Sequence, residues 1–194
     1  MTNADMFDSA ENFARMKNEL QWGSSYQRLP TMLEWAGLCD SGDWLRELGE
    51  QWTSFDNVNM YADELVDAVF MHHWDGYPIR HMMNDAELDA FDQLPEVLTV
   101  YRGCYTVNKW GFCWSLDRSV AERFPHMLRY GGEGRPLLVK GALQKSQIAA
   151  LKLDRSEAEI VTFVRPKCIS ISTARKPESW PQPGFPDTRV VQAA

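Results

Sequence analysis

Two carboxylates, Glu157 and Glu159, lie two residues apart where the segment RSEAEIVTF becomes aliphatic. In a strand, side chains two residues apart share a face, so these two would be about 7 Å from each other. Such neighbours repel unless a cation, a ligand or solvent compensates. Together they could stabilise positive charge that develops on a substrate, or accept a proton. A solvated strand end is the structural alternative.

Two more polar residues end short apolar runs earlier in the chain. Arg102 follows EVLTVY, and its planar guanidinium suits phosphate or carboxylate oxygens. Ser115 follows WGFCW, and its hydroxyl could orient a carboxylate. Each also has a structural interpretation, because Arg102 could pair with a structural carboxylate and Ser115 could help to start the following helix. The order of the three sites along the chain therefore carries more information than any one residue.

Helical patterns fill the first half of the chain. Apolar residues recur every three or four positions in ADMFDSAENFARMKNEL, LPTMLEWAGL, SGDWLRELGEQW and NMYADELVDAVFMHHW, which predicts four helices. A fifth, MNDAELDAFDQL, would begin after Asn84 or Asp85 and end near Pro95. Five of the eight tryptophans lie before residue 96, and we expect them to be buried anchors between helices, with an exposed recognition surface as the alternative.

Strand patterns follow from Glu96. We expect strands at EVLTVYRG, WGFCWSL, RPLLVKGAL, AEIVTFV and CISIS, and a helix at DRSVAERFPHML with Asp117 as its N-cap. The fold class is therefore α+β: a helical region over residues 1–94, a mainly β module over 95–174 and a Pro-rich tail over 175–194.

Charge divides the chain in the same way. Residues 1–96 hold 19 acidic and 5 basic residues, a net charge of −14, whereas residues 97–194 hold 8 acidic and 15 basic residues, a net charge of +7. A basic half suits a phosphate-bearing ligand, and an acidic half repels nucleic acid and suits a basic protein partner. No apolar run is long enough for a membrane span, and the four cysteines lack paired spacing, so we expect a cytoplasmic protein with reduced thiols.

The order of VYRG, FCWSLDRSVAERF and EAEIV resembles the ADP-ribosyltransferases of the Arg-Ser-Glu class. The resemblance covers about residues 96–172 and leaves the helical half unexplained. Cys113-Trp114-Ser115 replaces the three small polar residues of the family's Ser-Thr-Ser segment and keeps only the last of them. The interval between Arg102 and Ser115 is short, which indicates a reduced or replaced NAD-binding loop.

The resemblance implies a role for each candidate residue. NAD would be the substrate, Glu159 would stabilise the oxocarbenium-like state of the ribose, and Ser115 would orient Glu159. Arg102 would hold pyrophosphate or ribose oxygens, and Gly103 would let the backbone approach the nicotinamide amide. Glu157 would assist an arginine acceptor. The implied NAD-contacting aromatic residues, for which core packing is the alternative, are Tyr105, Trp110, Phe112 and Trp114.

Other motifs predict no site. RYGGEGRP lacks the Gly-Lys-Ser/Thr ending of a phosphate loop, and the spacing of His72, His73 and His81 does not suit a metal ion on one helix face. The proposed chemistry requires no metal.

The resulting expectation is a mono-ADP-ribosyltransferase, an NAD-dependent glycosyltransferase acting on a macromolecule, with a protein arginine preferred over nucleic acid as acceptor. A toxin or an effector between phage and host would suit such an activity. Two alternatives remain open at this point: an NAD glycohydrolase, and a non-catalytic acidic protein that blocks the nucleic-acid-binding groove of a basic partner.

Overall fold

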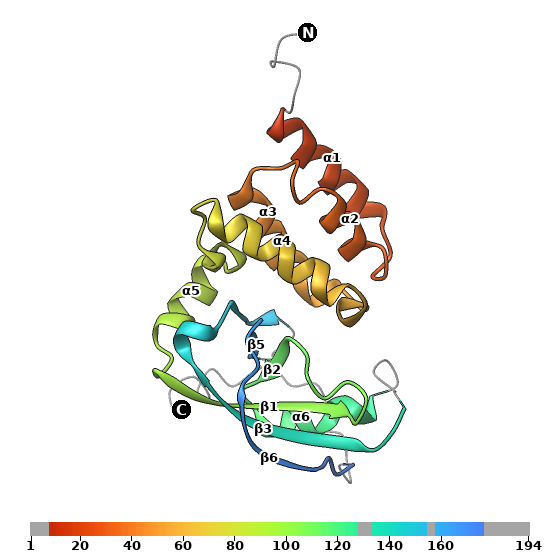
Figure 1. Ribbon diagram of the computed structural model, residues 1–194, viewed down its shortest axis with the longest axis vertical. Coiled ribbons are helices and arrows are strands. Elements are labelled where there is room, and N and C mark those ends of the chain that lie inside the picture. The colour runs from red at the N-terminus through yellow and green to blue at the C-terminus, as the bar shows by residue number, and fades with distance from the viewer. Residues whose placement is uncertain (1–7, 128–132, 155–157, 177–194) are drawn as a thin grey trace. The chain divides into compact units, whose positions relative to one another are not determined.

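The protein is α+β and divides into two compact units at the bond between Asn84 and Asp85 (Figure 1). The computed structural model describes residues 8–127, 133–154 and 158–176. Helices make up the described part of the first unit, and an antiparallel sheet is the centre of the second. The expected order of helices followed by a sheet is confirmed. The tail proposed at 175–194 lies outside the described residues from position 177 onward.

The predicted helices of the first unit are all present, with shorter bounds. They are α1 (Ser9–Trp22), α2 (Arg28–Glu34), α3 (Ser41–Gln51) and α4 (Ala62–Trp74), joined by the 3-10 turns η2 (Trp52–Ser54) and η3 (Val58–Tyr61) and followed by η4 (Ile79–Met82). Aspartate caps begin two of them: the Asp8 carboxylate accepts from the amides at the start of α1, and Asp40 does the same for α3.

Trp44 lies at the centre of the helical unit. Its ring is fully buried, and its indole nitrogen donates to the Met32 carbonyl at 2.8 Å, so the polar atom of this large side chain is satisfied. Gly49 lets α3 lie directly against η4, because a Cβ there would be 2.0 Å from the Met82 carbonyl oxygen. Other buried side chains of this core are Met16, Leu20, Leu29, Met32, Leu45, Leu48, Leu65 and Val69.

The expectation of buried tryptophans holds for only part of the set. Trp44 and Trp52 are buried, whereas Trp22 is 80% exposed and Trp74 is 85% exposed. The two exposed rings lie at the last residues of α1 and α4, where the helix ends beyond the core. Helical spacing identified the core positions, but it does not show where a helix leaves the core.

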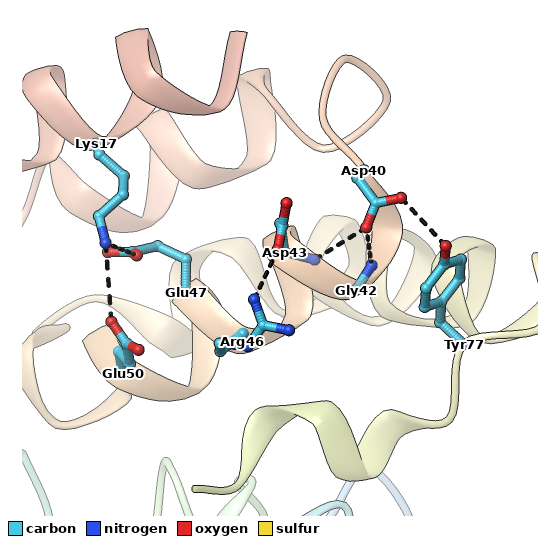
Figure 2. Close-up of polar contacts among 8 residues, drawn as sticks. All are labelled: Lys17, Asp40, Gly42, Asp43, Arg46, Glu47, Glu50 and Tyr77. Atoms are coloured by element: carbon cyan, nitrogen blue, oxygen red, sulfur yellow. Dashed lines mark hydrogen bonds and ion pairs between the residues drawn. The ribbon is translucent and has the colours of Figure 1, made fainter. Parts of the chain in front are cut away.

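A cation links α1 to α3 within the first unit (Figure 2). The Lys17 ammonium lies 3.0 Å from a Glu47 carboxylate oxygen and 4.0 Å from Glu50. The hydrogen bond to Glu47 is the main cause that raises the pKa of Lys17. The Glu47 side chain is only 3% exposed, so its carboxylate needs the Lys17 ammonium to compensate for lost hydration. Glu50 is exposed, and solvent stabilises its carboxylate.

The second unit begins with α5 (Asp85–Asp92). The remaining elements are β1 (Val97–Tyr105), β2 (Cys113–Ser115), α6 (Arg118–Arg123), η5 (Phe124–His126), β3 (Pro136–Gln144), η7 (Lys145–Gln147), β4 (Ala150–Lys152), β5 (Glu159–Val161) and β6 (Lys167–Thr173). Among the described residues they form a six-stranded sheet in the order β4-β5-β2-β1-β3-β6, with every neighbouring pair antiparallel. Asp117 caps α6 as predicted, because its carboxylate accepts from Ser119 and Val120.

Two features of this unit differ from the sequence expectation. The strand β4 was not predicted, since three residues are too few to show a period. The helix α5 packs on β4 and belongs to the sheet unit, so the change of unit comes at residue 84 and not at the expected residue 94. Along the described parts of the chain, we find no helix with the length and apolar character of a membrane span.

Replacing Lys17 with methionine tests the α1–α3 contact. The substitution keeps the apolar stem and leaves the buried Glu47 carboxylate without its cation. We expect the free energy of unfolding to fall by about 1–3 kcal/mol in urea titrations. Arg15→Met is the matched control on the same helix, because Arg15 pairs with Glu11 in solvent and should contribute less than about 1 kcal/mol. Equal decreases in the free energy of unfolding of Lys17→Met and Arg15→Met would contradict the stabilising role of the Lys17–Glu47 contact.

Candidate functional site

The sheet brings the three candidate sites together from distant parts of the sequence. β1, which carries Arg102, lies beside β2, which carries Ser115, and β2 lies beside β5, which begins at Glu159 (Figure 1). Positions that are up to 57 residues apart in the sequence thus lie on three strands that are neighbours in the sheet. The sequence order alone could not establish this neighbourhood.

Ser115 and Glu159 are direct cross-strand partners in the β2–β5 ladder. Partners in an antiparallel pair share a face, with Cβ atoms about 4.5–5.5 Å apart. Ser115 is 7% exposed, and its hydroxyl oxygen accepts from the Asp117 amide at 3.0 Å. A hydroxyl that accepts one hydrogen bond still has its own proton to donate, so Ser115 is suited to donate to a neighbouring carboxylate.

Arg102 makes contacts that differ from the expected ones. Its guanidinium donates to the Cys113 carbonyl at 2.7 Å and to the Asn108 carbonyl at 3.4 Å, and it lies against Gly111, where a Cβ would be 2.4 Å from Nη2. These contacts join β1 to the loop at 106–112. The Nε atom of Arg102 is buried and has no hydrogen-bond partner among the described residues.

The strand register also separates Arg102 from the Ser115–Glu159 pair. Tyr101 is the β1 partner of Ser115, so the next residue, Arg102, directs its Cβ to the opposite face of the sheet. Ser115, Glu159 and Tyr101 share one face. In the structure, therefore, two of the three sequence candidates meet, and the third supports the adjacent loop.

Gly103 and Tyr105 hold the segment around α6 against β1. A Cβ at Gly103 would be 1.8 Å from the Ala121 carbonyl oxygen, so the absence of a side chain allows the helix backbone to lie on the strand. The Tyr105 hydroxyl donates to the Pro125 carbonyl in η5. Both residues thus have structural contacts, and both lie within three residues of Arg102 in the sequence.

The three other aromatic candidates line one small pocket. Trp114 is 2% exposed, donates to the Gly111 carbonyl at 2.9 Å and stacks on Trp110 with ring centroids 6.4 Å apart. Phe112 lies 5.0 Å from Phe163 between centroids. The pocket holds about 120 Å³, whereas ligand pockets usually have about 300–1,000 Å³. It has no room for a whole dinucleotide.

A cation is among the residues that line this pocket. The Arg165 guanidinium carbon lies 3.5 Å from the centroid of Trp110, within the range of a cation–π contact. Trp114 belongs to the face opposite Ser115, because adjacent strand residues alternate. The aromatic pocket and the Ser115–Glu159 pair are therefore separate features. Glu157, the expected partner of an arginine acceptor, lies outside the described residues.

Sequence reasoning missed a buried ion pair beside Glu159. Lys152 on β4 is the other cross-strand partner of Glu159, and its ammonium lies 2.8 Å from a carboxylate oxygen of Glu87 on α5. The two charged residues are 65 positions apart and come from patterns that each suggest a solvated face. No local signal in the sequence could have paired them.

Sequence reasoning also missed a polar cluster in the helical unit. The Ser41 hydroxyl lies 3.2 Å from an Asp75 carboxylate oxygen and 2.8 Å from Nδ1 of His72, which is 1% exposed and stacks on Trp44. These distances are compatible with a Ser41 hydroxyl that donates to Asp75 and accepts from Nδ1 of His72. In that arrangement His72 would not accept the serine proton at Nδ1, so the distances do not favour Ser41 as a nucleophile.

Comparisons with protein-family models, with curated proteins and with solved structures found no match. Among the described residues there is no group of three or more histidine, cysteine or carboxylate side chains that could hold a metal ion.

The His72 cluster makes the stability of the helical unit depend on pH. Burial lowers the pKa of His72, partly opposed by Asp75, the Ala36 carbonyl and Asp40. As the pH decreases, His72 is protonated in the unfolded chain at a higher pH than in the folded protein. The free energy of unfolding should therefore be greatest above about pH 6.5 and decrease below that value. We expect the urea midpoint to fall more between pH 7.5 and 5 in the wild type than in His72→Gln.

His73→Gln is the control for that measurement, since His73 is an exposed neighbour on the same helix and should leave the pH dependence unchanged. The same decrease in His72→Gln as in the wild type would show that other groups cause it.

Proposed function

We propose that this protein is a mono-ADP-ribosyltransferase that moves ADP-ribose from NAD to a macromolecular acceptor and releases nicotinamide. The observation that carries the proposal is the direct pairing of Ser115 with Glu159 on β2 and β5. The sequence resemblance implies catalytic roles for these two residues, and their pairing supports a serine hydroxyl that orients the carboxylate.

The chemistry that we assign to Glu159 is electrostatic. As the bond between nicotinamide and ribose breaks, its electrons leave with nicotinamide and the sugar acquires oxocarbenium character. A carboxylate held beside the sugar stabilises that charge in the transition state more than in the bound substrate, which accelerates the reaction. The acceptor then forms a bond to the anomeric carbon and loses a proton, which Glu157 would accept if the acceptor is an arginine.

Arg102 takes part in this proposal as a binding residue. Its Nε hydrogen lacks an acceptor among the described residues, while its other nitrogens hold the loop at 106–112. NAD pyrophosphate would supply oxygen acceptors for a guanidinium. Because Arg102 begins on the face opposite Ser115, its contact with pyrophosphate is a separate part of the proposal from the Ser115–Glu159 pair. Gly103 and Tyr105 contact α6 and η5, and the aromatic pocket lies apart from the Ser115–Glu159 pair, so we assign none of these residues a contact with the reacting ribose.

The helical unit supports a basic protein as the acceptor. Along α4, the exposed side chains include Asp63, Glu64, Asp67, Met71 and Trp74. The helix contains no lysine or arginine. Carboxylates beside exposed apolar side chains favour a lysine- or arginine-rich protein surface over a nucleic acid.

Two alternatives lead to different products. If water replaces the macromolecule, the protein is an NAD glycohydrolase that yields free ADP-ribose. If neither NAD cleavage nor labelling occurs, the acidic exposed face of α4 favours a non-catalytic protein that binds a basic, nucleic-acid-binding partner.

The first experiment follows nicotinamide release and label transfer from NAD that carries its label on the adenylate side. Wild type, Glu159→Gln and the control Glu96→Gln are compared with and without cell lysate. Glu96 is an exposed acid just before β1, so its substitution should leave the rate unchanged. We expect Glu159→Gln to lower the rate about 10²–10³-fold, as loss of one transition-state stabilising group does.

The molecule that receives the label distinguishes the transferase from the glycohydrolase. Label on a lysate protein supports the transferase, and release with all label in free ADP-ribose supports the glycohydrolase. Negligible release by both the wild type and Glu159→Gln would overturn both enzyme assignments.

A further inference from the structure

Lys152 and Glu87 form an ion pair inside the sheet unit. The ammonium nitrogen lies 2.8 Å from Oε2 of Glu87, and the two side chains are 4% and 2% exposed. The second carboxylate oxygen of Glu87 accepts from the Leu153 amide at 3.3 Å. These contacts connect α5 with β4 and give the lysine ammonium a definite position.

Stability alone is a weak reason for such a pair. Removing two charges from water costs several kcal/mol for each ion, and apolar residues of similar volume are often at least as stabilising. The neighbouring positions of β4, Ala150 and Leu151, are apolar and fully or almost fully buried. A third apolar residue would continue that pattern, so the presence of a charge at position 152 calls for a local electrostatic explanation.

The register supplies that explanation. Lys152 pairs with Glu159, and Glu159 pairs on its other side with Ser115. The three residues form one row across β4, β5 and β2, and cross-strand partners share a face with Cβ atoms about 4.5–5.5 Å apart. The Glu159 side chain therefore begins between a serine on one neighbouring strand and a buried lysine on the other.

We propose that Lys152 is a positioning residue for Glu159: its charge, held in place by Glu87, balances the Glu159 carboxylate and fixes its location for the reaction. The inference rests on the proposed function, because the role of Glu159 in catalysis is part of that proposal. Burial makes the attraction between lysine and carboxylate stronger than it would be in water.

A charge exchange separates this role from a merely structural one. The double variant Lys152→Glu with Glu87→Lys keeps a buried ion pair between β4 and α5 but places a carboxylate opposite Glu159. If Lys152 only stabilises the fold, the exchange should preserve activity. If Lys152 positions Glu159, we expect kcat for nicotinamide release to fall about 10²-fold, the loss that a displacement of about 1 Å can cause, while KM for NAD changes little.

Two single variants complete the kinetic test. Lys152→Met should show the same loss in kcat, and Lys152→Arg, which keeps the charge, should recover most of it. Thermal unfolding midpoints identify any variant that fails to fold. Wild-type activity in the folded double variant would overturn the inference.

A measurement without NAD distinguishes failure of this inference from failure of the proposed function. In protein labelled with ¹³C at glutamate, the Glu159 carboxyl resonance is assigned by its loss in Glu159→Gln. We expect this resonance to shift in folded Lys152→Met and to shift much less in Lys152→Arg. An unchanged resonance in Lys152→Met would overturn the positioning role, whatever the activity, and an inactive wild type with the expected shifts would reject only the proposed function.

Discussion

The candidate site depends on the register between β2 and β5. A slip of one residue would turn one side chain of the Ser115–Glu159 pair to the opposite face, because strand side chains alternate. Main-chain hydrogen bonds extend the pairing beyond both ends of these three-residue strands. Leu116 donates to the Ala158 carbonyl at 3.1 Å, and Thr162 donates to the Phe112 carbonyl at 2.9 Å.

Close backbone contacts and the buried ion pair place other elements around that register. Gly103 allows α6 to lie on β1, and Arg102 joins β1 to the loop that precedes β2. At the other end of the row, α5 supplies the carboxylate that holds Lys152 in place. The helical unit has its own core around Trp44 and presents its own acidic surface. The proposed function therefore assigns catalysis and partner binding to different units of the chain.

The sequence predicted those parts of the structure that have a local physical cause. Helical spacing identified the helices α1 to α5, and a carboxylate before RSVAER identified the cap at Asp117. The chain order of Ser115 and Glu159 pointed to a pair that the sheet does form. The contacts of Arg102 and Lys152 were not predictable in this way, because they depend on strand neighbours and on α5, which only the tertiary fold establishes.

The most direct test of the central claim is a double-mutant cycle for nicotinamide release from NAD, with Ser115→Ala, Glu159→Gln and the two combined. If Ser115 acts by orienting Glu159, the account predicts that Ser115→Ala slows the wild type substantially but has almost no further effect in Glu159→Gln. Independent, multiplying losses would contradict the pairing, and activity that survives in the double variant at the wild-type rate would show that the reaction takes place elsewhere.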